Sequence, residues 1–412
     1  MKIKYCWGLL ILYLFVLVFL PPQCLYSLGS VNFITSGLAA LRYMLSFVFI
    51  VYLFLDNYYR QFIFSPYFFF FSLAIIFQVI ALIQNGSFYL TAGLSCLTNI
   101  GFVAANIILF HKQKILLLKA YRNILIVYFV LHFVTLVLFP GGLVPELTGD
   151  GRVYFMGSKN TVTTYMILVL LVSYLLCYYD SLAKKKDFYI LIVTLSVIAV
   201  LNASSTALVA LIIIISYLVT SYFSKKYTNI NRLLQKLFII FVLSVIIGFF
   251  YFVILLDGGN NFLMNGLTSI LGRDVTFSGR RAIWEAAIIF IIRAPLWGLG
   301  LDVQYDVWGN NQYVYSAHNT ILDYGVKYGC ISLFFMIISI IILIKVAVKK
   351  IKREPVRYAL ICVISLMFAM MFEAIEGFYT TWAIMLFTYL IIYYKDQNIE
   401  EKEFIYEYNG KN

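Results

Sequence analysis

The sequence predicts an all-α integral membrane protein with about 12 transmembrane helices and one long loop outside the membrane. Of its 412 residues, 63% are hydrophobic and only 12% are charged, whereas about a quarter of the residues in soluble domains are charged. The hydrophobic residues gather in segments that approach the roughly 20 residues a helix needs to cross a bilayer. The basic residues fall mainly in alternate connections between these segments, as the positive-inside rule expects.

The predicted membrane part consists of apolar segments before and after the long loop. They cover approximately residues 5–22, 34–55, 66–84, 90–110, 117–139, 161–180, 187–202, 205–223, 234–256, 319–345, 358–373 and 378–394. Residues 1–256 thus hold spans one to nine, residues 257–318 form the long loop, residues 319–394 hold spans ten to twelve, and residues 395–412 form a tail.

The first segment follows the basic start MKIK, but no small-x-small cleavage motif comes after it. We therefore expect an uncleaved first span rather than a signal peptide. The six cysteines are scattered through apolar segments without paired spacing, which predicts neither a metal site nor a disulfide framework.

The lysines and arginines predict that both termini lie in the cytoplasm. With the N-terminus inside, 23 of the 31 basic residues fall on the inner side, and Arg42 lies within the second span. The remaining ones are predicted on or near the outer face: Arg152, Lys159, Arg273, Arg280, Arg281, Arg293 and Lys327. This topology explains the net charge of +12 without a nucleic-acid partner. Abundant Phe, Tyr, Ile and Lys suit an AT-rich genome and favour a bacterial cytoplasmic membrane.

Segments 187–202 and 205–223 leave two interpretations open, because only Ala203 and Ser204 separate them. Either a tight turn joins two spans, or one segment is re-entrant. A merger into one span would exchange the sides of every later loop, and the basic run KKIKR at 349–353 argues against that.

The long loop is expected to contain a helix near residues 279–293, within SGRRAIWEAAIIFIIRAP. Its apolar stretch is too short to span a bilayer. Ser278 is suited to cap the start, and Pro295 marks the end. Arg281 and Glu285 share one face, and an anchor lying in the outer interface is the simplest interpretation. The following segment, PLWGLGLDVQY, is expected to turn at its two glycines.

Outer cations are not explained by topology, and those of the loop are arginines. Arginine binds phosphate oxygens through two parallel hydrogen bonds and keeps its charge. Arg273, Arg280 and Arg281 in the loop, with Arg152 and Lys159 in GDGRVYFMGSKN, therefore predict an anionic substrate or anionic lipid headgroups at the outer face. A lipid-linked pyrophosphate is the substrate that fits best.

His318 begins the tenth span in YSAHNTILDYGVKYG. A neutral imidazole, the usual form for a pKa near 6.5, accepts a proton from a sugar hydroxyl, although a histidine at a helix start is also a common structural residue. Asp323 lies about 140° around the helix from His318 and is better placed to pair with Lys327, so no His–Asp dyad is predicted. Glu373 and Glu376 in the last outer turn, FEAIEGFY, would either be solvated or help to position a sugar, and Glu376 is retained as a candidate.

These motifs together resemble those of the O-antigen ligase and Wzy polymerase superfamily, across roughly residues 150–345. The pieces are SGRRAIWEAAIIFIIRAPLWGLGLD, SAHNTILDYGVKYG and RVYFMGSKNTVTTYMIL. The resemblance implies a GT-C-like membrane glycosyltransferase that uses no metal and no cofactor. One position departs from the family pattern: Ser205 stands where the family often carries an arginine.

The resemblance also implies roles for individual residues. His318 matches the histidine thought to activate the acceptor hydroxyl, Arg280 matches a pyrophosphate contact, and Arg152 with Asn160 matches an earlier element. Arg281, Arg273 and Lys159 are further candidate pyrophosphate ligands, and Asn319 joins Asn160 and Glu376 as a candidate that positions substrate.

The function expected from these residues is polymerisation of lipid-linked oligosaccharide repeat units, for a capsule, exopolysaccharide or O-antigen. The substrate would be a polyprenyl-pyrophosphate-linked oligosaccharide, the surroundings membrane lipids, and the partners a flippase and a chain-length regulator. Two alternatives remain open: an O-antigen ligase that uses a different acceptor, and a flippase or transporter. Transporters usually show internal repeats, and none is evident here.

Overall fold

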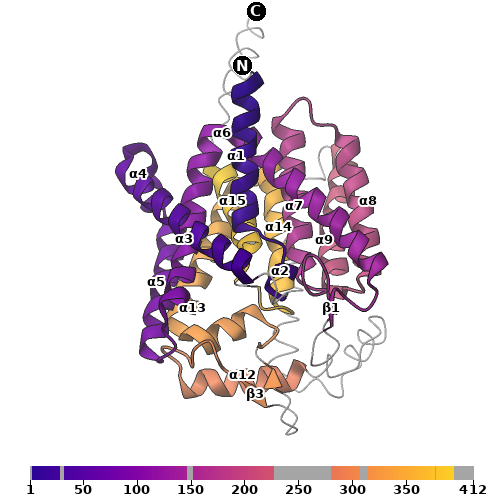
Figure 1. Cartoon of the computed structure of the whole chain (residues 1–412). Helices are drawn as coiled ribbons and strands as arrows, with labels where there is room; N and C mark the ends of the chain where they lie inside the picture. The colour runs from indigo at the N-terminus through magenta and orange to yellow at the C-terminus, as the bar shows by residue number, and fades with distance from the viewer. Residues whose placement is uncertain are drawn as a thin grey trace, which may run out of the picture.

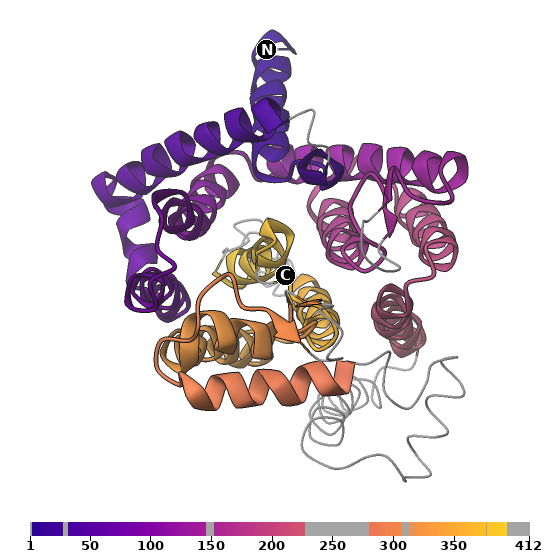
Figure 2. The same ribbon diagram turned by 60° about the horizontal axis from the view of Figure 1, so that its bottom comes forward.

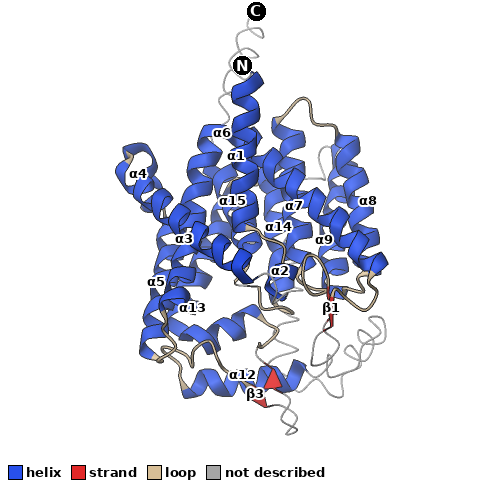
Figure 3. Cartoon of the chain, in the orientation of Figure 1, coloured by secondary structure: helices blue, strands red, loops and turns tan. Residues whose placement is uncertain are grey.

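The computed structural model describes residues 2–27, 32–145, 152–226, 280–306, 313–314, 316–375 and 377–393. This part of the chain is an assembly of α-helices with two small two-stranded sheets (Figure 1). Strands β1 (Val144–Pro145) and β2 (Arg152–Val153) pair antiparallel, as do β3 (Tyr305–Asp306) and β4 (Tyr313–Val314). The architecture is that of an all-α membrane protein, as predicted (Figure 3).

The helices before the long loop follow the predicted apolar segments closely. They are α1 (Lys2–Phe19), α2 (Cys24–Ser27), α3 (Asn32–Leu55), α4 (Asn57–Ile63), α5 (Pro66–Gln84), α6 (Leu90–Leu138), α7 (Val162–Tyr179), α8 (Lys185–Leu201) and α9 (Ser205–Lys226). The remaining described helices are α12 (Arg280–Arg293), α13 (Thr320–Lys349), α14 (Glu354–Met370) and α15 (Tyr379–Tyr393).

Six of the described helices are long and apolar enough to cross a membrane: α3, α5, α6, α7, α9 and α13. Trp7–Phe19 and α15 are apolar but shorter. The predicted segment 234–256 lies outside the described residues, so the total of 12 spans stays a prediction.

Helix α6 is two antiparallel helices joined at Gln113, whose backbone is not helical (φ −147°, ψ 48°). The hydroxyl of Tyr121 donates a hydrogen bond of 2.8 Å to Oδ1 of Asn106. In a straight helix these two residues would be about 22 Å apart along the axis. The chain therefore folds back at Gln113, and the predicted segments 90–110 and 117–139 fall on either side of this turn.

A tight turn separates α8 from α9, as the first interpretation of residues 187–223 expects, and the prediction that both helices span the membrane stays open. Ala203 adopts a positive φ of 50°, and the amide of Ser204 donates to the carbonyl of Ala199. The two helices contact each other and both contact α7.

Helices α14 and α15 form the centre of the assembly, surrounded by the other helices (Figure 2). All residues of α15 from Thr380 to Ile392 are buried, as expected of a helix that is apolar on every side. Arg353, before α14, donates to the carbonyl of Ile391 near the end of α15, so the two helices run antiparallel.

Helix α12 runs across one end of the bundle, opposite the end where α1 begins (Figure 1). It buries Ile283, Trp284 and Ala287 against Leu322 and Val326 of α13. The helix expected near residues 279–293 is thus packed on protein along one side rather than surrounded by lipid.

Candidate active site

Side chains from three regions of the sequence meet around one carboxylate, that of Glu373 in the connection between α14 and α15. The side chain of Glu373 is 14% exposed. Its Oε1 accepts a hydrogen bond of 2.8 Å from Nη2 of Arg280 and a short one from the amide of Asn160. Its Oε2 lies 3.9 Å from Nδ1 of His318.

Arg280 is the first residue of α12, and its guanidinium points toward the bundle rather than toward a lipid interface. Nη1 donates to the carbonyl of Phe372 at 2.6 Å, and Nη2 forms the ion pair with Glu373. The side chain is only 12% exposed. Of the five N–H donors of a guanidinium, these two bonds use two, and within the described residues the other three have no partner and could bind an anion.

His318 is the one histidine at this cluster, and its backbone has an unusual conformation. Its φ of 48° lies in the left-handed region, which a residue with a β-carbon adopts at an energetic cost. Its amide donates to Oγ of Ser316 at 3.2 Å, and its side chain is 41% exposed. The imidazole therefore has one edge toward Glu373 and remains accessible to a ligand.

The residues after His318 fasten it to the α14–α15 connection. The side-chain oxygen of Asn319 caps α13 by accepting from the backbone amides of Ile321 and Leu322. Its side-chain amide nitrogen donates to the carbonyl of Met371. The hydroxyl of Thr320 donates to the carbonyl of Glu373 at 2.6 Å. Asn319 is fully buried, so its side chain holds the backbone in place.

The residue before His318 is held from the other side. The indole of Trp284 donates to the carbonyl of Ala317 at 2.9 Å, and the amide of Ala317 donates to Oδ1 of Asp323 at 2.8 Å. Asp323 is completely buried and pairs with Lys327. The predicted Asp323–Lys327 pair is therefore present, and the carboxylate partner of the histidine is Glu373.

Asn160 brings the start of α7 to the same carboxylate. It is 7% exposed, its amide donates to Glu373, and its Oδ1 accepts from the hydroxyl of Ser204 at 3.0 Å. Ser204 belongs to the turn before α9. Its neighbour Ser205 is the position where the family often has an arginine. In this protein the positive charge among the described residues of the cluster comes from Arg280 instead.

The pKa of the Glu373 carboxyl is lowered below its ordinary value. Burial alone would raise the pKa, but the neighbouring His318 side chain and the charge of Arg280 outweigh it. Glu373 is therefore an anion at neutral pH. A carboxylate beside an imidazole stabilises the imidazolium that forms when the ring accepts a proton.

The glycines of PLWGLG let the chain pass directly over a break in α13. Gly298 and Gly300 have φ of 69° and 95°, and Gly329 within α13 has φ of 76°. A β-carbon on Gly329 would lie 2.1 Å from the carbonyl oxygen of Leu296. Only glycine fits such a close approach. The contact holds the segment after α12 against the first part of α13, and the turn predicted at Gly298 and Gly300 lies in this segment.

The other predicted site residues lie away from the cluster or cannot be placed. Arg152 and Lys159 are exposed, and Arg152 donates to the carbonyl of Pro140. The side chain of Arg281 and the whole of Arg273 and Glu376 fall outside the described residues. Among the described residues, no three His, Cys, Asp or Glu side chains gather as a metal site requires.

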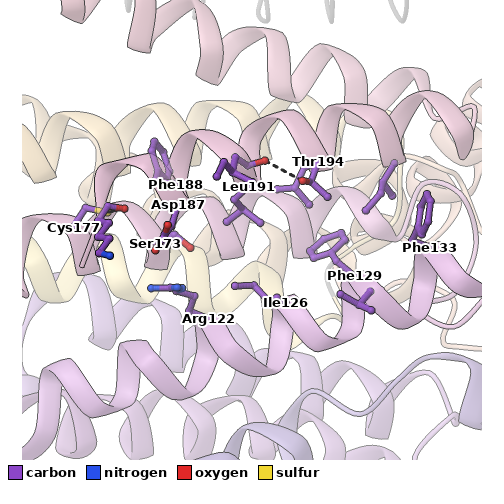
Figure 4. Close-up of a pocket in the computed structure, with 15 residues that line it drawn as sticks. Arg122, Ile126, Phe129, Phe133, Ser173, Cys177, Asp187, Phe188, Leu191 and Thr194 are labelled. Atoms are coloured by element: carbon purple, nitrogen blue, oxygen red, sulfur yellow. Dashed lines mark hydrogen bonds between the residues drawn. The ribbon is translucent and has the colours of Figure 1, made fainter. Parts of the chain in front are cut away.

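A cavity of about 350 Å³ has none of the cluster's residues in its lining. It lies between the second part of α6, α7 and α8, with Arg122, Cys177 and Asp187 at one end and Phe133 at the other (Figure 4). Cys177 and Asn160 are at opposite ends of α7, about 25 Å apart along the axis. The cavity also lacks a histidine among its lining residues.

Comparison with known proteins supports the resemblance seen in the sequence. No curated protein sequence matches the chain. A protein-family model described as O-antigen ligase matches residues 190–337, a range that includes Arg280 and His318. This match is consistent with a member of the O-antigen ligase and polymerase superfamily.

Proposed function

We propose that the protein is a Wzy-type polymerase, a membrane glycosyltransferase that extends a lipid-linked glycan at the outer face of a bacterial cytoplasmic membrane. The observation that supports this most directly is the convergence of Arg280, His318 and Asn160 on the buried carboxylate of Glu373. Such a cluster provides a base, a group that stabilises its protonated form, and a cation.

In the proposed reaction, the glycan on a polyprenyl pyrophosphate is the donor. A hydroxyl of the next lipid-linked repeat unit attacks the anomeric carbon of the donor sugar. The hydroxyl proton passes to His318, a C–O bond forms between the sugars, and the bond from the anomeric carbon to the pyrophosphate breaks. The pyrophosphate leaves with the electron pair and stays attached to its lipid.

The ionic groups of the cluster have complementary tasks in this reaction. Glu373 lies 3.9 Å from Nδ1 of His318, which leaves Nε2 to take the proton. The free donors of Arg280 would bind the leaving pyrophosphate, where preorganised charge lowers the barrier most. No step in this scheme requires a metal ion. Asn160 and Asn319 would act as positioning residues, holding Glu373 and the backbone at His318.

An O-antigen ligase is the second candidate, because the matching family model carries that description. A ligase uses the same kind of donor but passes the glycan to a different lipid acceptor. The donor side of the cluster would serve either reaction.

The test is extension of a lipid-linked repeat unit by the purified protein in liposomes, comparing wild type with His318→Ala. The matched control is His111→Ala. His111 hydrogen-bonds Tyr58 near the turn of α6, away from the cluster. We expect a ladder of products from wild type and from the control, and none from His318→Ala.

Other outcomes would redirect the proposal. A full ladder from His318→Ala would remove the histidine from the chemistry. A single transfer to an added acceptor lipid without pyrophosphate, and no ladder, would identify a ligase. Movement of the glycolipid across the bilayer without any new glycosidic bond would indicate a transporter.

A further inference from the structure

A second, smaller cavity of about 210 Å³ is lined in part by Gly377, Phe378 and Tyr379, which follow Glu373 in the chain. Its lining comes from the end of α1, from α2, and from the first turns of α7 and α15, together with Arg42 of α3. The polar and aromatic side chains around it are those of Gln23, Tyr26, Arg42, Tyr165, Phe378 and Tyr379. None of them takes part in the reaction described above.

Arg42 supplies a positive charge that the described residues do not neutralise. Its Nη2 donates to the hydroxyl of Tyr26 at 2.9 Å, and its Nε is 3.4 Å from the carbonyl of Leu38. Its guanidinium carbon lies 5.8 Å from the centre of the Tyr379 ring. Within the described ranges no carboxylate forms an ion pair with Arg42, although a cation inside a membrane span is costly without an anion.

The aromatic groups of the cavity are held in fixed positions. The hydroxyl of Tyr379 is hydrogen-bonded to Oγ1 of Thr98 at 2.6 Å, and its ring packs against Phe19. Gln23 and Tyr165 both line the cavity. Because the Tyr26 oxygen accepts from Arg42, its own proton is available to a ligand.

We infer that this cavity, which we call the Arg42 pocket, binds the phosphate and first sugar of a second lipid-linked saccharide. A guanidinium binds phosphate oxygens, phenol and amide groups hydrogen-bond sugar hydroxyls, and tyrosine faces pack on the C–H face of a sugar. Arg42 lies in a helix that reaches the membrane, where the phosphate of a lipid-linked substrate is found.

This inference rests on the proposed function and makes it more specific. Polymerisation needs two glycolipids at once, and the acceptor keeps its pyrophosphate throughout the reaction. The cluster at Arg280 has donors for the leaving pyrophosphate of the donor. The Arg42 pocket provides a separate cation for the acceptor.

The inference predicts two binding sites, which can be counted without turnover. The probe is a polyprenyl pyrophosphate carrying one sugar, and the readout is the number of probes retained by the full-length protein in native mass spectrometry. We expect two for wild type, one for Arg42→Gln and one for Arg280→Gln. The matched control is Arg122→Gln, because Arg122 lines the other cavity (Figure 4), and it should retain two.

Two milder variants protect the test against misfolding of Arg42→Gln. Arg42→Lys keeps the charge without the planar fork, and Tyr26→Phe removes the hydroxyl that holds the guanidinium. Each variant is expected to weaken binding of the probe in the Arg42 pocket about tenfold or less, and to leave binding at the Arg280 cluster unchanged.

Several results would overturn the inference. Two probes on Arg42→Gln, or a single probe on wild type, would remove the Arg42 pocket as a glycolipid site. Loss of one probe from Arg122→Gln would transfer the second site to the larger cavity. If excess phosphatidylglycerol displaces the Arg42-dependent probe as readily as unlabelled probe does, the pocket binds ordinary phospholipid headgroups. Failure of the proposed function appears elsewhere, as the absence of a product ladder from the wild-type protein.

Discussion

Replacement of Glu373 by Gln tests the chemistry of the cluster most directly, because it removes one charge and almost no volume. The glutamine can still accept hydrogen bonds from Asn160 and Arg280. What it loses is the negative charge that lies 3.9 Å from Nδ1 of His318. The imidazolium formed during proton transfer would then lack its counter-ion.

The magnitude follows from that distance. Two unit charges 3.9 Å apart attract by about 1 kcal/mol in water and by about 4 kcal/mol at an effective dielectric constant of 20. The side chain of His318 is 41% exposed, so solvent screening places the value at about 2 kcal/mol. Since 1.36 kcal/mol corresponds to a factor of ten, we expect the transfer rate to fall about 30-fold.

The assay is the single-turnover rate of glycan transfer at saturating donor and acceptor, with the amount of folded protein measured in the same membranes. Glu354→Gln is the matched control. Glu354 is the first residue of α14, at the end of that helix far from Glu373, and it accepts a hydrogen bond from Tyr174. A folded Glu373→Gln protein that transfers within threefold of wild type would refute the role of the carboxylate.

Three further predictions concern stability. The pKa of Glu373 is lowered in the fold, so its charge stabilises the protein above the ordinary carboxyl pKa of about 4.3, and this contribution is lost as the pH falls through the lowered value. Between pH 5 and 3 the melting temperature of wild type should therefore fall more steeply than that of Glu373→Gln. Parallel melting-temperature curves for the two proteins would contradict this. Gly329→Ala should destabilise by at least about 1–3 kcal/mol from the backbone conformation alone, measured as a lower melting temperature, whereas Gly37→Ala, where a β-carbon meets nothing within 4 Å, should not. Asp323→Asn should cost about 3–5 kcal/mol by removing the charge of the buried carboxylate that pairs with Lys327, and the double variant with Lys327→Gln should recover part of that loss; additive losses in thermal unfolding would show that the pair is not coupled.

The sequence was informative about helices because their signals are local. Apolar length and glycine or proline positions predicted α5, α7 and α12 within a residue or two of their observed bounds. The turn inside α6 had a weaker signal, the basic and polar stretch HKQK at 111–114. The structure shows the reversal through the Asn106–Tyr121 hydrogen bond.

The arrangement of the site could be predicted only in part. His318, Arg280 and Asn160 carried motif signals, and they meet at one carboxylate. Which glutamate of FEAIEGFY would receive them could not be read from the sequence, because Glu373 and Glu376 share the same short turn. The choice of Glu373 depends on how Thr320 and Asn319 fasten the backbone of residues 371–373, and such contacts join segments some 50 residues apart.

The anchoring of the chain on both sides of His318 has a consequence for the speed of the reaction. Ala317 is tied to Trp284 and Asp323, and Asn319 is tied to Met371, so the backbone between them has little freedom to move. Shortening the 3.9 Å gap between His318 and Glu373 to a hydrogen bond then needs only rotation of the side chain, a motion of picoseconds to nanoseconds for an exposed residue. In the part of the chain that the structure describes, this step requires no slow loop closure. Turnover would be paced by the arrival and departure of long glycolipids, and it should therefore slow as the membrane becomes more viscous.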